Sequence, residues 1–145
     1  RAGYRQQSEN RVQAAQFDAL GIPSRETDLA RELLQTLPGT RAPATAVPAG
    51  FTEVFAHYQR SQDIVGLQDL LRRWPHLRCE RIIDLNSRQA FLWVADGNDR
   101  LLLVANLAPR DGARRFQWSE TGDPGETIEA FIDTRAGWLE VGGRP

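Results

Sequence analysis

The residues best suited to nucleophilic chemistry in this sequence are one cysteine and two histidines. Cys79 is the only cysteine, and His76 precedes it by three positions. A thiolate beside an imidazole base can act as a nucleophile, and Arg78 and Arg81 next to the cysteine would favour the thiolate. A small enzyme that uses Cys79 and His76 is therefore an alternative function. We favour an inert, buried cysteine and surface histidines, His57 included, and assign no catalytic residue.

The same residues do not predict a metal site. His76 and Cys79 supply two ligands, and no second pair with metal-binding spacing follows them. Residues 96–99, Asp-Gly-Asn-Asp, begin like a calcium loop but lack its later ligands, so a hairpin turn explains them. Lysine is absent from the chain, which excludes Schiff-base chemistry and the lysine of a P-loop. We predict neither a metal nor a cofactor.

Arginine is the strongest candidate for binding, because all 18 basic residues of the chain are arginines. A planar guanidinium group binds carboxylates and phosphates through two parallel hydrogen bonds, and neighbouring aromatic rings can stack on a ligand. The largest concentration of basic side chains precedes and enters the first strand predicted in the second half. Its members are Arg72, Arg73, His76, Arg78, Arg81 and Arg88.

A second basic group, Arg114 and Arg115 with Trp118, falls on another predicted strand. The alternative for this group is a charged edge strand, because edge strands carry charge that discourages aggregation. The net charge of the chain is −1, so no overall field attracts nucleic acid. A weak nucleic-acid-binding or anion-binding domain remains a further alternative, with nucleic acid an unlikely partner. The residues that we select for binding are Arg81, Trp93, Arg114 and Trp118.

The elements that must position these residues change type halfway along the chain. In the first half, apolar residues recur at helical spacing, and glycine and proline separate the segments. We predict helices over residues 4–20, from Ser24 or Thr27 to Leu37, over 52–60 and over 61–74. A connector rich in proline, alanine and glycine, residues 38–50, interrupts this half.

In the second half, short apolar segments alternate with residues that favour tight hairpin turns, such as Gly97-Asn98 and Asp111-Gly112. This spacing is typical of an antiparallel, up-and-down sheet. Asp123 and Pro124 fit the start of a short helix. We predict strands over residues 78–85, 89–95, 101–107 and 113–118, and a last strand over 137–141.

Together these elements predict a single α+β domain over residues 1–145. A helical N-terminal half would pack on a four- to five-stranded antiparallel meander, with a short C-terminal helix. The strands at 89–95 and 101–107 are apolar on both faces, so both faces of the sheet need cover. We favour packing within the chain, with a homodimer through a sheet face as the second interpretation.

Residues 82–86, Ile-Ile-Asp-Leu-Asn, resemble the opening of extracytoplasmic sensor domains of the PAS-like kind. Those domains place helices between their second and third strands, where this chain has a tight turn. No run of 18 apolar residues is present, so a membrane connection is expected only through an anchor upstream of Arg1. We expect a non-catalytic domain that binds a small ligand or a protein partner. It would be the sensor or assembly part of an anchored bacterial protein, periplasmic rather than cytoplasmic.

Overall fold

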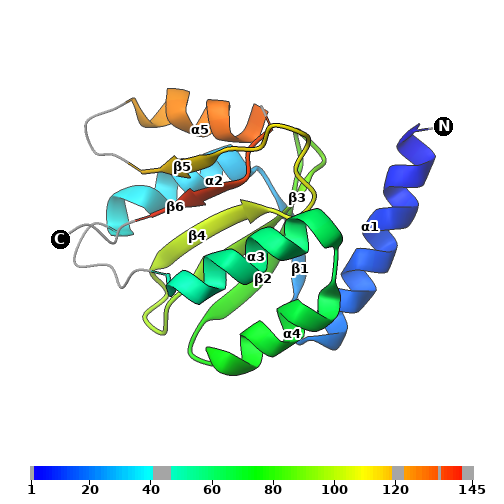
Figure 1. Ribbon diagram of the computed structural model, residues 1–145. Coiled ribbons are helices and arrows are strands. Elements are labelled where there is room, and N and C mark those ends of the chain that lie inside the picture. Colours follow the sequence, from blue (N-terminus) through cyan, green and yellow to red (C-terminus); the bar gives the residue numbers. More distant parts are fainter. Residues whose placement is uncertain (1, 41–46, 119–122, 134, 142–145) are drawn as a thin grey trace.

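Within residues 2–40, 47–118, 123–133 and 135–141, which the computed structural model describes, six strands form one mixed sheet (Figure 1). Helices cover both faces of this sheet, so the molecule has three layers. In chain order the elements are α1 (Ala2–Ala19), β1 (Ser24–Thr27), α2 (Leu29–Thr36), the 3₁₀ helix η1 (Leu37–Thr40), α3 (Ala49–Ser61), α4 (Ile64–Arg73), β2 (Arg78–Asp84), β3 (Ala90–Ala95), β4 (Leu101–Asn106), β5 (Arg115–Gln117), α5 (Pro124–Asp133) and β6 (Trp138–Glu140).

The antiparallel part of the predicted sheet is confirmed for β2, β3 and β4, which pair in succession through tight turns. The turn at residues 96–99 is organised by Asp96, whose carboxylate Oδ1 accepts hydrogen bonds from the N–H groups of Asn98 at 2.8 Å and Arg100 at 3.0 Å. Asp99 adopts a φ of 60° in this turn. These residues therefore form a hairpin, as the sequence indicates.

The prediction of a wholly helical first half is wrong, because β1 lies within it. Ser24 and Thr27, expected as helix caps, are the two ends of this strand. The cap of α2 is Asp28, whose carboxylate accepts a hydrogen bond from the N–H of Arg31 at 3.2 Å. β1 runs parallel to β2 at the edge of the sheet and is tied to it by the N–H of Arg81, which donates to the carbonyl of Pro23 at 2.8 Å.

The prediction of a simple meander also needs correction at the other edge. The strand order is β1-β2-β3-β4-β6-β5, so the last strand lies between β4 and β5 and runs parallel to β5. The carbonyl of Arg114 accepts hydrogen bonds from the N–H groups of Gly137 at 2.8 Å and Trp138 at 3.3 Å. A Cβ atom at Gly137 would lie 2.8 Å from that carbonyl oxygen, so the close approach of the two strands requires glycine.

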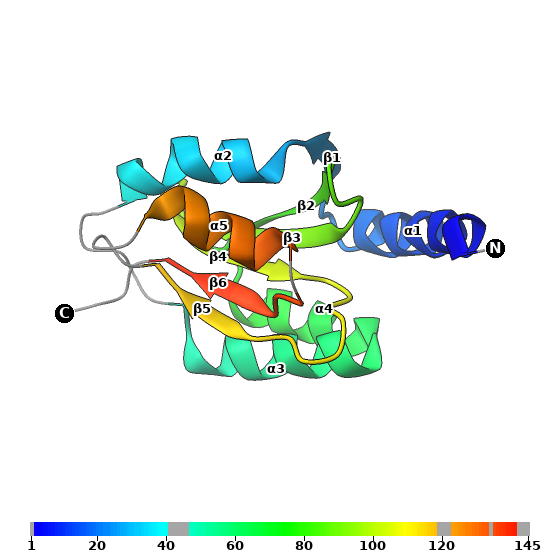
Figure 2. The same cartoon turned by 90° about the horizontal axis from the view of Figure 1, so that it is seen from above.

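The two faces of the sheet are covered by different helices, as Figure 2 shows. Helices α3 and α4, with the C-terminal end of α1, cover one face and bury Phe17, Phe55 and Leu67. Helices α2 and α5 cover the other face and bury Leu33 and Phe131. Packing within the chain therefore covers both faces of the sheet.

Helix α1 contacts the body through its C-terminal half, where Gln13 hydrogen-bonds to Tyr58 and Arg81, and it runs away from the sheet towards its N-terminus (Figure 1). Phe17 is fully buried, and its ring meets that of Tyr58 edge to face, with the centroids 6.0 Å apart. Part of the predicted connector, residues 41–46, lies outside the described residues. Among the helices of the described segments, none has the length and apolar character needed to cross a membrane.

Candidate anion-binding pocket

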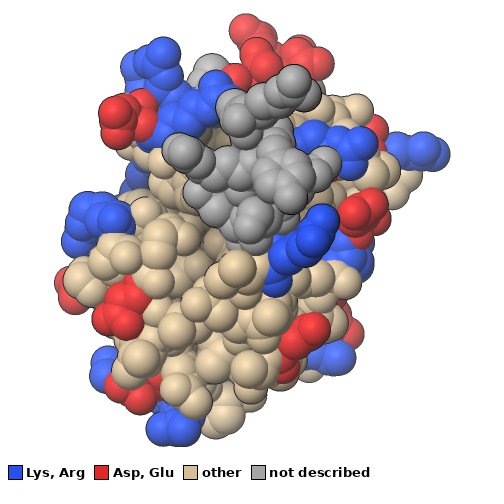
Figure 3. Space-filling model, turned by 90° about the vertical axis from the view of Figure 1, so that its right-hand side faces the viewer, with Lys and Arg blue, Asp and Glu red and all other residues tan. Residues whose placement is uncertain are grey.

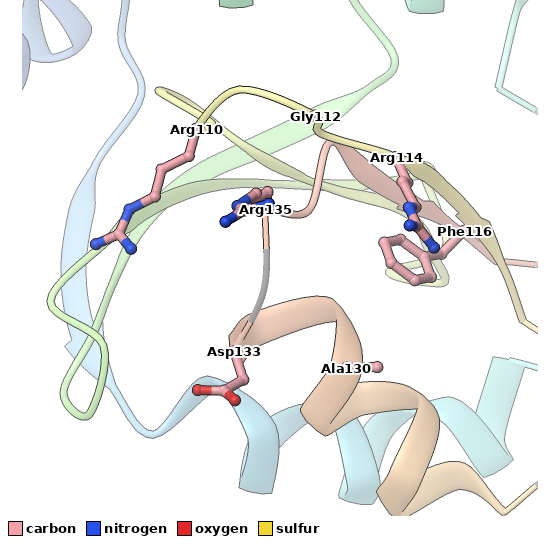
Figure 4. Close-up of a pocket in the computed structure, with 7 residues that line it drawn as sticks. All are labelled: Arg110, Gly112, Arg114, Phe116, Ala130, Asp133 and Arg135. Carbon is pink, nitrogen blue, oxygen red and sulfur yellow. The ribbon is translucent and has the colours of Figure 1, made fainter.

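A pocket of about 410 Å³ opens where the β4–β5 connection, β5 and the end of α5 meet (Figure 4). Three arginines and one aspartate supply its polar groups, and a phenylalanine and an alanine supply its apolar wall. Its lining residues are Arg110, Gly112, Arg114, Phe116, Ala130, Asp133 and Arg135.

Hydrogen bonds to β6 and a tight turn fix the backbone of residues 112–114, which precede β5 at the edge of the pocket. Arg114 comes directly before β5, and its carbonyl is bound by β6, so the position of its side chain is set by the parallel strand pair. Gly112 has a φ of +82°, a left-handed conformation that favours glycine. A Cβ atom at Gly112 would lie 3.8 Å from Cδ of Arg135, so the arginine side chain passes close to this turn.

Helix α5 forms the opposite wall and is fixed to β5 by aromatic packing. The ring of Phe116 meets that of Phe131 edge to face, with centroids 5.6 Å apart and an interplanar angle of 83°. Phe131 also packs on Phe91 of β3, with centroids 5.8 Å apart. This packing places Ala130 and Asp133 of α5 across the pocket from β5.

The three arginines of the pocket are not neutralised by any residue that the structure describes. Arg110, Arg114 and Arg135 are exposed, and their guanidinium groups make no hydrogen bond or ion pair with any residue in the described ranges. The neighbouring Arg115, in contrast, is paired with Glu140. Since Asp133 is the one carboxylate among the lining residues of the described ranges, these residues carry three positive charges and one negative charge. An electropositive hollow of this kind attracts anions.

Of the four residues that the sequence selects for binding, only Arg114 lines this pocket. Trp118 follows β5, where its N–H donates to the carbonyl of Glu140 at 3.0 Å and its half-buried side chain packs against the core beneath α2 and α5. These two residues share the β5 edge. Sequence reasoning missed Arg110 and Arg135, which lie outside the predicted strands.

The other two selected residues lie far along the sheet, on opposite faces. Arg81 is only 2% exposed, and its guanidinium donates to Oε1 of Gln13 at 2.8 Å and to Oγ of Ser24 at 3.1 Å. Burial lowers the pKa of Arg81. Trp93 is 8% exposed and has the guanidinium of Arg25 5.9 Å from its ring centroid. The fold therefore does not bring the four residues into one site.

The geometry around Cys79 does not favour the alternative of a cysteine enzyme. Cys79 packs against the apolar cluster beneath α3 and α4, and burial raises the pKa of its thiol to about 12. The thiol is therefore protonated at neutral pH, whereas nucleophilic attack needs the thiolate. His76 and His57 are both exposed. Within the part of the chain that the structure describes, no three His, Cys, Asp or Glu residues are grouped to hold a metal ion.

The basic group between positions 72 and 88 does not form a single patch. Arg81 is buried, Arg78 is paired with Asp99 at 3.0 Å, and Arg72 lies 3.8 Å from Asp69. On the side of the molecule that carries α1, positive and negative side chains are interspersed around a broad uncharged area (Figure 3). The described residues on this face do not form the basic stripe that is typical of nucleic-acid-binding surfaces.

No protein-family model matches this chain, and comparison with curated proteins and with solved structures gives no match either. The geometry of the pocket is therefore the basis for a functional proposal.

Proposed function

We propose that this protein is a non-catalytic binding domain that holds an anionic group in the pocket between β5 and α5. The anion would be a carboxylate or phosphate carried by a small ligand or by a protein partner. The observation that carries the proposal is the presence of three guanidinium groups, on Arg110, Arg114 and Arg135, that line one hollow without any partner among the described residues.

The lack of a partner for these arginines among the described residues supports a binding role. Several other exposed arginines of the chain are paired with carboxylates, whereas these three add to the positive potential along one hollow. An anion in the pocket would compensate this charge and would form charge-assisted hydrogen bonds, which are about twice as strong as neutral ones. Binding of an anion is therefore the event that would stabilise this arrangement.

The chemistry of the lining supports binding rather than catalysis. Among the described residues that line the pocket, none is a cysteine, serine, threonine, histidine or lysine that could serve as an activated nucleophile. Asp133 is the one carboxylate of this described lining, and general acid–base catalysis of glycoside hydrolysis needs a pair of such groups. Arginine remains charged at all physiological pH values and serves to hold an anion in place.

The first experiment is a titration of the ¹⁵N-labelled protein with inorganic phosphate at low ionic strength. We expect saturable shifts of the backbone amide signals of Gly112 and Arg114, with a dissociation constant in the millimolar range. Arg114→Gln and Arg135→Gln should each weaken binding about tenfold, which corresponds to about 1.4 kcal/mol.

The matched control is Arg72→Gln, which removes an exposed arginine from α4 on the other face of the sheet. This variant should bind phosphate as the unmodified protein does. Shifts that spread evenly over the surface arginines, or equal losses in the control and the pocket variants, would overturn the proposal.

A further inference from the structure

The size of the pocket bears on which class of anion it holds. A volume of about 410 Å³ lies within the range of roughly 300–1,000 Å³ that is usual for sites of small organic ligands. A single phosphate or carboxylate group would leave most of this space to water. The pocket is therefore large enough for an anion that carries a substantial organic part.

The apolar groups of the pocket lie towards one end, where one arginine accompanies them. In the view of Figure 4, Arg110 and Asp133 lie towards one end, and Arg114, Phe116 and Ala130 lie towards the other, with Arg135 between them. Arg114, directly before β5, and Phe116 of β5 both line the pocket at this end. A guanidinium group and an aromatic ring thus flank one end of the pocket.

The ring of Phe116 is available to a ligand on its pocket side. Its edge-to-face packing on Phe131 fixes the ring, yet the residue remains half-buried and lines the pocket opposite the small side chain of Ala130. A planar ring placed here would stack on an aromatic surface that is already held in position. Arginine and aromatic side chains are the two groups that stack well on planar ligands.

We infer that the ligand is a ring-bearing organic anion, in which a planar aromatic ring is joined to one acidic group. The ring lies between Phe116 and Ala130, and the acidic group lies among the arginines. Asp133 disfavours a second acidic group at its end of the pocket and accepts a hydrogen bond from a hydroxyl or amino substituent there. This inference rests on the proposed anion-binding function and adds the chemical class of the ligand.

The test compares phenyl phosphate with methyl phosphate, which share the acidic group and differ in the ring. In the unmodified protein we expect phenyl phosphate to bind about tenfold more tightly, by calorimetry or by amide-shift titration. Intermolecular nuclear Overhauser effects should connect the phenyl protons with the methyl group of Ala130. This comparison needs no variant, so it does not depend on how a substitution affects folding.

Variants separate the roles of the ring and the charge. Phe116→Leu should weaken the binding of phenyl phosphate more than that of methyl phosphate and so reduce the preference to less than about threefold, whereas Phe116→Tyr should keep the preference. Arg114→Gln should weaken both probes, and Asp133→Asn should strengthen methyl phosphate binding about twofold to fivefold because it removes a like charge.

The outcomes distinguish the two proposals. If neither probe binds the unmodified protein, the proposed anion-binding function fails, and the ligand class fails with it. If both probes bind equally well and no Overhauser effect reaches Ala130, anion binding stands and the inference of a ring-bearing ligand is overturned.

Discussion

Single residues connect the layers of this protein, and Asp84 at the end of β2 is the clearest case. Its side chain is 1% exposed. One carboxylate oxygen accepts a hydrogen bond from the N–H of Leu29 at 3.0 Å, and the other accepts from the N–H of Ser87 at 2.8 Å. Asp84 therefore accepts hydrogen bonds from backbone N–H groups at the start of α2 and in the β2–β3 turn. These two segments are far apart in the sequence.

We expect Asp84→Ala to lower the free energy of unfolding by about 2–4 kcal/mol, because two backbone donors lose their acceptor inside the protein. Urea denaturation followed by tryptophan fluorescence measures this change. The control is Asp69→Ala, whose carboxylate is exposed on α4 and should cost less than about 0.5 kcal/mol. Equal losses in the two variants would contradict the structural role of Asp84.

The sequence predicts one of the three pocket arginines as a binding residue and misses the other two. Arg114 is predicted as a binding residue because it shares a strand with aromatic side chains. Arg110 and Arg135 are not predicted, since one lies in a turn, the other follows α5, and 24 residues separate them. They approach only because α5 packs on β5 through Phe116 and Phe131, and a sequence pattern does not carry that contact.

Among the elements, β1 illustrates how a polar edge strand is held in place. Arg25 of this strand donates from Nη1 to Oε2 of Glu32 in α2 at 2.8 Å and from Nε to Oε2 of Glu80 in β2 at 2.5 Å. Its hydrogen bonds lower the pKa of Glu32 below the usual value for a glutamate. Arg25 therefore links β1 both to the neighbouring strand β2 and to the helix α2.

The effect of Glu32 on stability should depend on pH. A carboxylate whose pKa is lowered on folding stabilises the protein above its unfolded pKa, and the contribution disappears as the pH falls through the folded pKa. We expect Glu32→Gln to cost about 0.5–1 kcal/mol at pH 7, a small value because Arg25 is over a third exposed. The difference from the unmodified protein should shrink as the pH falls below the unfolded pKa and vanish once the pH is below the lowered folded pKa of Glu32.

Urea denaturation at pH 7 and pH 3 measures this prediction. Glu53→Gln, on the exposed side of α3, serves as the control and should give no pH-dependent difference. A constant difference between Glu32→Gln and the unmodified protein at both pH values would show that the ion pair does not contribute as described.

Local signals predict some elements well and others poorly. Hairpin turns and apolar strands predict β2, β3 and β4, and Asp123 with Pro124 predicts α5. The strand β1 is missed because its sequence, Ser-Arg-Glu-Thr, has no apolar alternation and its partner is more than 50 residues away. The place of β6 is missed because turn signals identify strands that follow one another, whereas β6 enters between two earlier strands.

At the scale of the whole molecule, the cover on both sheet faces removes the main argument for a homodimer. The strands with two apolar faces are buried under α3 and α4 on one side and under α2 and α5 on the other. The remaining large exposed apolar side chains in the described ranges lie apart on α1, α2, α4 and the β2–β3 turn: Val12, Leu34, Val65 and Leu85. Scattered residues of this kind are usual on monomers.

We therefore expect the isolated chain to be monomeric at micromolar concentrations. Native mass spectrometry at several protein concentrations measures the subunit number and also detects any small molecule that remains bound. A stable dimer would contradict this expectation and would direct attention to the strand edges at β1 and β5, because the sheet faces are already occupied.

The insertion of β6 between β4 and β5 has a consequence for synthesis on the ribosome. All six residues of β4 are buried in the finished protein, and β6 supplies the strand that pairs with its second side. Chain growth proceeds at about 5–20 residues per second, so β4 is an open, apolar edge for a few seconds before residues 138–140 emerge. An edge of this kind can pair with another chain. The nascent protein is therefore most prone to aggregate in this interval.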